Sequence, residues 1–361
     1  MSLFEELVGN VRSGRASRRK TIRMGVAGEG PDLSLIAAAF RASCDVSSLM
    51  YYHPDAKKAE KFAKEIGALP ASNAQEFVSG VGAAELLTIP GGRAELAESL
   101  LRAGVHVSLR KPIADNLEEV ESLAAAARES KSFLSVDDEA FFFEPYNKLK
   151  ELVGKMEVGE ICAARFRVNL AGEGGWGPQA DLLKTNYGLF HPCFDIIAYA
   201  IELLGDVESV MAYLNPMKTG ARGKGGGQSM IALKFKSAGC YGVVELTYAP
   251  GTAIRTEGYP CDASIELAGT DGIIWANHFY GKMTETPWLE VRRGKKYFSL
   301  GIASGMAVEW PDAVRASAAH FATNAAYGTA PKPGIERSRS ALKVILAAIE
   351  ASESGSEIHL I

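Results

Sequence analysis

Through the first third of the chain, short apolar runs alternate with amphipathic stretches, and this alternation constrains the fold more than any other feature. The runs have the length and the β-branched or aromatic content of strands, whereas the stretches between them have helical spacing. Strands that alternate with helices form βαβ units, whose right-handed connections close a parallel sheet. Residues 22–140 are therefore predicted to form one doubly wound α/β domain. The expected strands are Ile22–Ala27, Val46–Tyr51, Glu85–Ile89, Val105–Leu109 and Phe133–Val136, and the expected helices are Leu33–Arg41, Asp55–Ile66, Ala94–Ala103 and Leu117–Glu129.

The pattern changes after Phe141, where strand-like runs begin to follow one another without helices between them. Successive strands of this kind favour an antiparallel or mixed sheet. A chain of 361 residues also suits two domains, at the usual ~100–200 residues for each. Residues 141–361 are therefore predicted to form a second, α+β domain that ends in helices. The expected strands are Glu160–Leu170, Val207–Leu214, Ser229–Phe235, Tyr241–Tyr248, Ala263–Leu267 and Gly272–Ala276, and the expected helices are Pro145–Gly154, Gly188–Leu204, Ala313–Tyr327 and Glu336–Ser352.

Residues 1–21 stand apart from both domains, with a short apolar stripe followed by several basic residues. We interpret them as an N-terminal arm. A nucleic-acid hook is the alternative, but no aromatic residues interleave with the charges. The segment Ser17–Ile22 also resembles a twin-arginine export signal, yet the apolar region that such a signal needs does not follow it. The expected location is therefore the cytoplasm.

Composition narrows the class of partner. Apolar residues make up 47% and charged residues 23% of the chain, which is typical of a globular protein. A net charge of −4 gives no overall attraction to nucleic acid or to an anionic membrane. The five cysteines are scattered without a C-x-x-C pair, which is typical of a reducing compartment, and no apolar run reaches the ~20 residues of a membrane span. A small molecule is the expected partner, with neither nucleic acid nor membrane.

The turn Gly28-Glu29-Gly30 lies where the first strand should lead into the first helix. Glycines at such a turn let the backbone approach a pyrophosphate, and the helix N-terminus supplies free N–H groups. Leu33 stands where the usual motif has a third glycine, so the turn alone is a weak signal. Its place within a series of βαβ units strengthens it. Gly28, Glu29 and Gly30 are therefore predicted to bind a dinucleotide.

The end of the second strand usually carries an acid for the ribose hydroxyls of a dinucleotide. Here the strand ends in Tyr51 and Tyr52, with neither an acid nor an arginine. The tyrosine hydroxyls are the candidates for the ribose, and Lys57 or Lys58 for a 2′-phosphate. Both NAD and NADP therefore remain open as the cofactor.

Several short motifs follow one another in an order and spacing that resemble the glucose-fructose oxidoreductase and inositol dehydrogenase family (Gfo/Idh/MocA). Arg110-Lys111-Pro112 is similar to the Glu-Lys-Pro motif of that family, and Ile89-Pro90-Gly91 is similar to its Thr-Pro-Asn turn. The resemblance runs from about residue 23 to the end of the chain. Its other segments are Phe143–Tyr146, Val158–Ile161, Ala319–Phe321, Lys332-Pro333 and Glu353–Gly355.

The resemblance implies a Rossmann-type first domain and an open sheet in the second, with a substrate cleft between them. It also implies an NAD(P)-dependent oxidoreductase that acts at a carbinol carbon of a sugar, cyclitol or related polyol. Homodimers or homotetramers that associate through their sheets are expected. Ile89, Pro90, Arg110 and Lys111 are the further residues that the resemblance assigns to the cofactor site.

Hydride transfer from an alcohol requires a base for the hydroxyl proton and a cation near the oxygen. The resemblance assigns the cation, and with it a candidate base, to Lys111. A lysine in solvent at a strand end is the alternative. The Asp-x-x-x-His signature of the family has its counterpart in Tyr187 and His191, so that His191 is the second acid/base candidate and Tyr187 replaces the aspartate. A buried structural histidine is the alternative for His191.

Metal chemistry has little support in the sequence. His191 and Asp195 are spaced i, i+4 and could both face a cation, but no third ligand is marked, so no metal is expected. Three changes fall on important family positions: Arg110, Tyr187 and Tyr51. They leave a second hypothesis open, a catalytically degenerate sensor that binds a nucleotide or a sugar on the same fold.

Overall fold

The computed structural model describes most of the chain from residue 20 onward. The predicted N-terminal arm lies almost wholly outside the described residues, as do Ile89 and Pro90. The described residues are 20–360 except 88–91, 112, 115, 138, 172–186, 216–226, 237–238, 250–255, 258–260, 278–281, 284–286, 302–308 and 332–333.

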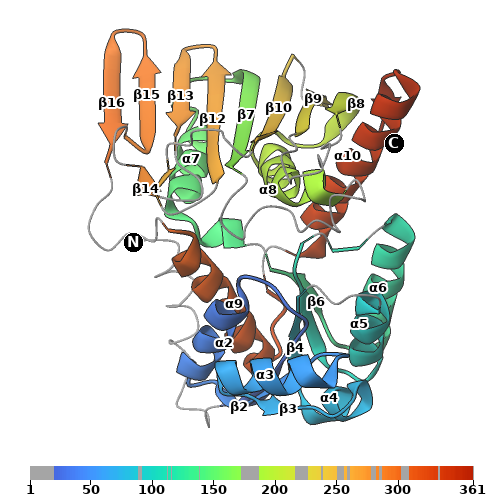
Figure 1. Ribbon diagram of the computed structural model, residues 1–361. Helices are drawn as coiled ribbons and strands as arrows, with labels where there is room; N and C mark the ends of the chain where they lie inside the picture. The colour runs from blue at the N-terminus through green and yellow to red at the C-terminus, as the bar shows by residue number, and fades with distance from the viewer. Residues whose placement is uncertain are drawn as a thin grey trace.

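The first domain is a six-stranded parallel sheet with helices on both faces (Figure 1). Its strand order is β3-β2-β1-β4-β5-β6, the order of doubly wound dinucleotide-binding sheets. The predicted α/β class is confirmed. Its elements are β1 (Ile22–Ala27), α2 (Leu33–Ala42), β2 (Val46–Tyr52), α3 (Ala56–Ile66), β3 (Leu69–Pro70), α4 (Ala74–Gly80), β4 (Ala83–Leu86), α5 (Arg93–Arg102), β5 (His106–Leu109), α6 (Leu117–Ser130) and β6 (Leu134–Val136).

Helix α3 shows how local chemistry sets the boundaries in this domain. The Asp55 side chain accepts hydrogen bonds from the backbone N–H groups of Lys57 and Lys58, which caps the N-terminus. The helix ends at Gly67, whose left-handed φ of 66° costs a glycine little. The sequence predicted this helix within one residue. It missed β3 and α4, which are too short to show a period.

The second domain carries a nine-stranded sheet in the order β16-β15-β13-β12-β7-β10-β9-β8-β17. Only β7 and β10 pair in parallel, so the sheet is mixed and largely antiparallel, as predicted. A separate ribbon joins β11 (Thr256–Glu257) to β14 (Lys282–Met283). The sheet strands are β7 (Ile161–Ala171), β8 (Val207–Asn215), β9 (Gly227–Phe235), β10 (Tyr241–Ala249), β12 (Cys261–Gly269), β13 (Gly272–Ala276), β15 (Leu289–Arg293), β16 (Lys296–Leu300) and β17 (Ile358–His359).

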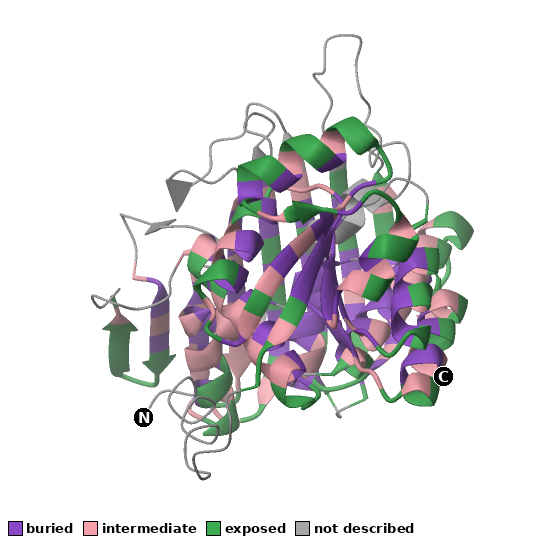
Figure 2. Ribbon diagram, turned by 90° about the horizontal axis from the view of Figure 1, so that it is seen from below, coloured by how far each residue is buried: buried purple, intermediate pink, exposed green. Residues whose placement is uncertain are grey.

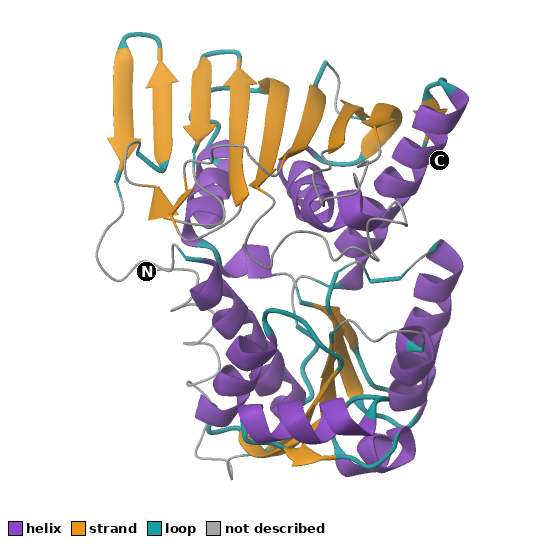
Figure 3. Ribbon diagram, viewed as in Figure 1, coloured by secondary structure: helices purple, strands orange, loops and turns teal. Residues whose placement is uncertain are grey.

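Three helices pack against this sheet: α7 (Glu144–Gly154), α8 (Tyr187–Leu204) and α10 (Ile335–Ser354) (Figure 3). The opposite face of the sheet carries large exposed side chains, among them Tyr213 and Met230, which lie opposite each other on β8 and β9. In the described part of the chain, no helix is both long and apolar enough to cross a membrane.

Helix α9 (Trp310–Tyr327) belongs by sequence to the predicted second domain, but it packs on the first. It lies beside α2 (Figure 1), and Trp310, Val314 and Phe321 join a cluster with Met24 of β1 and Ile36 of α2. Buried residues line the strands and the facing sides of the helices (Figure 2). The boundary at residue 140 therefore marks where the chain leaves the first sheet, not where it last contacts it.

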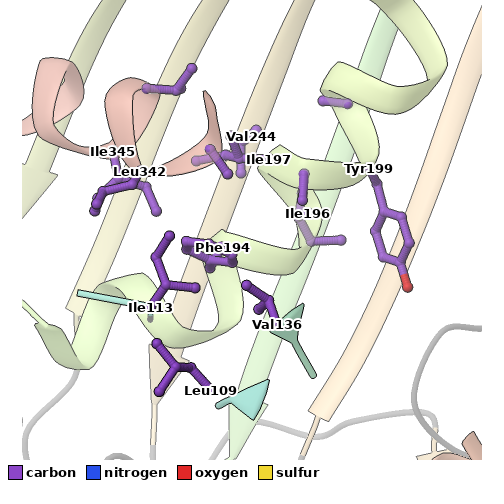
Figure 4. Packing of buried hydrophobic residues seen from close by; sticks show 14 of the residues in the cluster. Leu109, Ile113, Val136, Phe194, Ile196, Ile197, Tyr199, Val244, Leu342 and Ile345 are labelled. Carbon is purple, nitrogen blue, oxygen red and sulfur yellow. The ribbon is translucent and has the colours of Figure 1, made fainter. Parts of the chain in front are cut away.

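One hydrophobic cluster continues from the first domain into the second. Figure 4 shows Leu109 and Val136, at the ends of β5 and β6, close to Phe194 of α8. Each of these side chains is at most 7% exposed. The carboxyl ends of β5 and β6 are thus packed against the second domain.

Candidate functional site

The glycine turn connects β1 to α2 at the carboxyl edge of the first sheet. Gly28 has a φ of 91°, a conformation that residues with a side chain rarely adopt. A side-chain carbon built on Gly30 would meet no atom within 4 Å, so the backbone there borders open space. β1 and β4 flank the point at which the strand order reverses, where such sheets bind dinucleotides. The turn therefore offers the room and the N–H groups that a pyrophosphate needs.

Tyr51 lies at the end of β2 and is fully buried. Its hydroxyl donates a hydrogen bond to the carbonyl oxygen of Gly28 at 2.8 Å. Burial raises the pKa of Tyr51, so the hydroxyl keeps its proton. The hydroxyl assigned to the ribose from the sequence thus holds the glycine turn against β2.

Other groups at the end of β2 are available to an adenosine ribose. Lys58 Nζ of α3 pairs with Glu29 Oε2 of the glycine turn at 2.9 Å. His53 is 4% exposed and accepts a hydrogen bond from the Asp55 N–H at Nδ1, while its Nε2 has no hydrogen-bond partner among the described residues. Tyr52 stacks on Phe77 with ring centroids 5.7 Å apart. His53 was not predicted as a site residue, because its only signal in the sequence is its position directly after the strand.

Arg110 follows β5 and is 6% exposed. Its guanidinium hydrogen-bonds Asp32 at the N-terminus of α2 and Asp137 directly after β6, and it lies 3.5 Å from Glu139. Burial alone would lower its pKa, but the surrounding carboxylates raise it. Helix α9 completes the network, because Ser317 donates to Asp137 and Trp310 Nε1 lies 3.4 Å from Asp32. Arg110 therefore joins the glycine turn, the end of β6 and α9.

Lys111 lies beside Arg110, and its side chain is 1% exposed. The alternative of a lysine in solvent is wrong. Its Nζ lies 2.9 Å from Glu139 Oε2 and also pairs with Asp195 of α8. Two carboxylates from opposite domains thus hold one buried ammonium at the carboxyl edge of the first sheet.

Helix α8 brings the second domain to this site. It contains Tyr187 and His191, whose side chains lie outside the described part of the structure. The helical repeat puts positions 187, 191 and 195 on one face of α8. Asp195, considered in the sequence only as a metal ligand, is the residue of this series that contacts Lys111. Among the described residues, no group of three His, Cys, Asp or Glu side chains is arranged to hold a metal ion.

Negative charge exceeds positive charge in this cluster, and the excess is relieved by protons. Burial raises the pKa of Glu139 to about 8, and it raises the pKa of Glu85 well above its usual value. Burial works in the same direction at Asp137, but Arg110 and Ser317 hold the pKa of that carboxyl below its usual range. The buried side chains of the cluster are the cations Arg110 and Lys111 and the carboxyls Asp32, Glu85, Asp137, Glu139 and Asp195.

Comparison with known proteins agrees with this geometry. Residues 22–138 match the model of an oxidoreductase family with an NAD-binding Rossmann fold (Gfo/Idh/MocA). No curated protein sequence matches the chain.

Three solved structures resemble the whole fold. A levoglucosan dehydrogenase in complex with NADH and levoglucosan is 18% identical, with a TM-score of 0.74, and the match covers 94% of this chain and 99% of that protein. An Agrobacterium radiobacter oxidoreductase in complex with NAD⁺, L-tartaric acid and magnesium is 16% identical, with a TM-score of 0.74 and coverages of 94% and 98%. A Synechocystis biliverdin reductase in complex with biliverdin and NADP⁺ is 19% identical, with a TM-score of 0.74 and coverages of 92% and 99%.

At these identities the structural matches establish the fold, whereas the family match carries the assignment of the first domain. That assignment agrees with the strand order, the glycine turn and the strand-end Lys111. The resemblance inferred from the short motifs is confirmed. Residues 22–138 match the NAD-binding Rossmann domain of the Gfo/Idh/MocA oxidoreductase family.

Proposed function

We propose that this chain is an NAD(P)-dependent oxidoreductase that oxidises or reduces a carbinol carbon of a sugar, cyclitol or related polyol. The observation that carries the proposal is the buried ammonium of Lys111, held by Glu139 and Asp195 at the carboxyl edge of the first sheet. A fixed cation in a site shielded from water stabilises the negative charge that develops on a reacting oxygen. The levoglucosan dehydrogenase supports the sugar class, because it has the same fold around its own sugar.

Each predicted residue has a role in this proposal. Gly28, Glu29 and Gly30 bind the dinucleotide phosphates and ribose, together with Tyr52, Ile89 and Pro90. The Tyr51 hydroxyl holds the turn through its hydrogen bond to the Gly28 carbonyl oxygen. Arg110 links the turn, through Asp32, to the network that holds Lys111. The nicotinamide, when bound, supplies the carbon that accepts or donates the hydride. Lys111 meets the reacting oxygen, Lys111 and His191 are the two candidate bases, and Tyr187 accompanies His191 on α8.

The proposal is tested in two measurements on the purified protein. Binding of NAD⁺, NADH, NADP⁺ and NADPH is measured by calorimetry, and turnover is followed by the absorbance of the reduced nicotinamide with a panel that includes levoglucosan, myo-inositol and tartaric acid. We expect one coenzyme pair to bind and at least one panel member to turn over.

Lys111→Met should lower kcat/KM by roughly 10²–10³-fold, because it removes a cation that acts in the transition state, and should leave the affinity for the reduced coenzyme within a few-fold. Lys148→Met, a third exposed on α7, is the matched control and should behave as the wild type. Coenzyme binding without turnover of any panel member, with Lys111→Met indistinguishable from the wild type, would instead support the sensor hypothesis.

A further inference from the structure

Glu139 is the most enclosed acid of the Lys111 cluster. It begins η1 (Glu139–Phe142), and none of its surface is exposed. Oε2 lies 2.9 Å from Lys111 Nζ, and Oε1 lies 3.5 Å from Arg110 Nη2. One carboxyl group thus lies at ion-pair distance from both cations of the cluster, and among the described residues neither of its oxygens has an aligned hydrogen-bond partner.

The groups around Glu139 come from five elements. Lys111 and Arg110 follow β5, Asp137 follows β6, and Asp195 belongs to α8. Burial raises the pKa of Glu139 to about 8, and the two cations oppose that rise. Two groups lie farther along η1: His320 of α9, whose ring centroid is 5.4 Å from that of Phe142, and Arg337 of α10, which lies over the ring of Phe141. Burial lowers the pKa of His320, so this imidazole is neutral in the range where Glu139 titrates.

The proposed oxidation leaves one proton in this enclosed site for every hydride that it transfers. The alcohol loses a hydride from carbon and a proton from oxygen, and the C–O bond becomes a carbonyl. Lys111, as an ammonium, has no lone pair for the hydroxyl proton until it gives up a proton of its own. Glu139, when ionised, is the carboxylate at ion-pair distance that receives that proton once the two side chains align, and Lys111 then takes the proton of the hydroxyl. In this step, the alcohol, the oxidised coenzyme and the Glu139 carboxylate would be converted into the carbonyl compound, the reduced coenzyme and the Glu139 carboxylic acid.

This balance also conserves charge. Before the step, the site holds a positive nicotinamide and a negative Glu139, and after it both are neutral. A buried site tolerates such a neutral exchange far better than the creation of a net charge. We infer that Glu139 is the positioning residue that holds the reaction proton, ionised with the oxidised coenzyme and protonated with the reduced one. This inference rests on the proposed function.

The inference predicts a pH dependence of binding that requires no substrate. Oxidised coenzyme favours the ionised form of Glu139 and so lowers its pKa in the complex. Its Kd should therefore fall as pH rises toward the pKa of free Glu139, about 8, and should level off above it. The limiting slope is about tenfold for each pH unit. The Kd of the reduced coenzyme should stay constant over the same range, so the ratio of the two dissociation constants is the measured quantity.

Variants test whether Glu139 is the source of this pH dependence of coenzyme binding. Glu139→Gln keeps a polar partner for Lys111 but cannot ionise. The ratio of its dissociation constants for the oxidised and the reduced coenzyme should therefore be constant with pH and equal to the ratio of the wild type at low pH. Glu139→Asp should restore a pH-dependent ratio. Glu98→Gln is the control, because it removes a carboxyl of α5 that pairs with Arg102 away from the cluster, and it should retain the wild-type dependence.

The outcomes separate the inference from the function on which it rests. If oxidised and reduced coenzymes bind the wild type with a ratio that does not change with pH, the inference is overturned and the proposed function stands. Persistence of the dependence in Glu139→Gln also overturns it, by assigning the proton to another group such as His191. If neither form of either coenzyme binds, the proposed function itself fails. The wild-type measurement decides the matter even where a variant does not fold.

Discussion

Arg110 illustrates how a single charged residue is accommodated in the interior. Removing a charge from water costs several kcal/mol unless partners compensate for it. Here Asp32, Asp137 and Glu139 do so, and they come from three different parts of the first domain. The motif resemblance marked Arg110 and Lys111 in the sequence. It could not mark their partners, because Asp32 and Asp195 reach the cluster only through the packing of elements far apart in the chain.

Glu85 gives a prediction at the same scale. It is 1% exposed on β4, and its raised pKa means that the folded protein keeps a proton that the unfolded chain loses above pH ~4.3. Folding then takes up a proton, so this group makes the wild type less stable as pH rises toward its folded pKa.

Glu85→Gln removes that dependence. Relative to the wild type, the variant should gain free energy of unfolding as pH rises above ~4.3 toward the raised pKa of Glu85, with a limiting slope of ~1.4 kcal/mol for each pH unit. Urea unfolding of both proteins at several pH values measures the difference. A constant difference across that range would show that Glu85 is ionised in the folded protein.

Among the elements, the long helices and strands with a regular apolar period were predictable from the sequence. The short elements were not. The predicted helix Gly188–Leu204 corresponds to α8 within one residue, whereas the hairpin of β15 and β16 was missed. Both strands have five residues, and β16 is exposed along nearly its whole length, so the pair carries little hydrophobic signal. The helix α9 was predicted from its apolar spacing, but such spacing says only that one face is buried and does not identify the partner.

The partner of α9 leads to a second prediction. Trp310 is 5% exposed and lies in the cluster that α9 shares with α2 and β1. Trp310→Ala should destabilise the protein by about 3–5 kcal/mol through lost burial and the cavity that remains. Tyr327→Ala, on the same helix but 36% exposed, should cost less than about 1 kcal/mol. Equal losses in urea unfolding would contradict the docking of α9 on the first domain.

At the scale of the whole molecule, the face of the nine-stranded sheet opposite α7, α8 and α10 carries large exposed side chains. Tyr213 and Tyr241 are 65% and 53% exposed, and Met230 lies beside Tyr213 on the neighbouring strand. Large exposed aromatic and apolar side chains on one sheet face, here beside charged residues such as Glu245 and Lys234, commonly mark interfaces. We therefore expect the homo-oligomer that the family resemblance implies to form through this face.

Light scattering of the eluted protein tests the expectation. The wild type should elute as a dimer or a tetramer, and Tyr213→Glu combined with Met230→Glu should reduce the mass, because two carboxylates would be desolvated at the interface. Leu69→Glu, an equally exposed apolar position on the first domain, should leave the mass unchanged. A monomeric wild type at micromolar concentration would argue against the interface.

The path of the chain between the two domains has a mechanical consequence. The polypeptide leaves the first domain after β6, returns to it as α9 and leaves again for α10, so three covalent connections span the boundary around the Lys111 cluster. A single linker allows wide rotation, whereas three connections at different points resist it. Domain movement in this protein should therefore be a limited sliding of packed surfaces rather than a wide hinge opening.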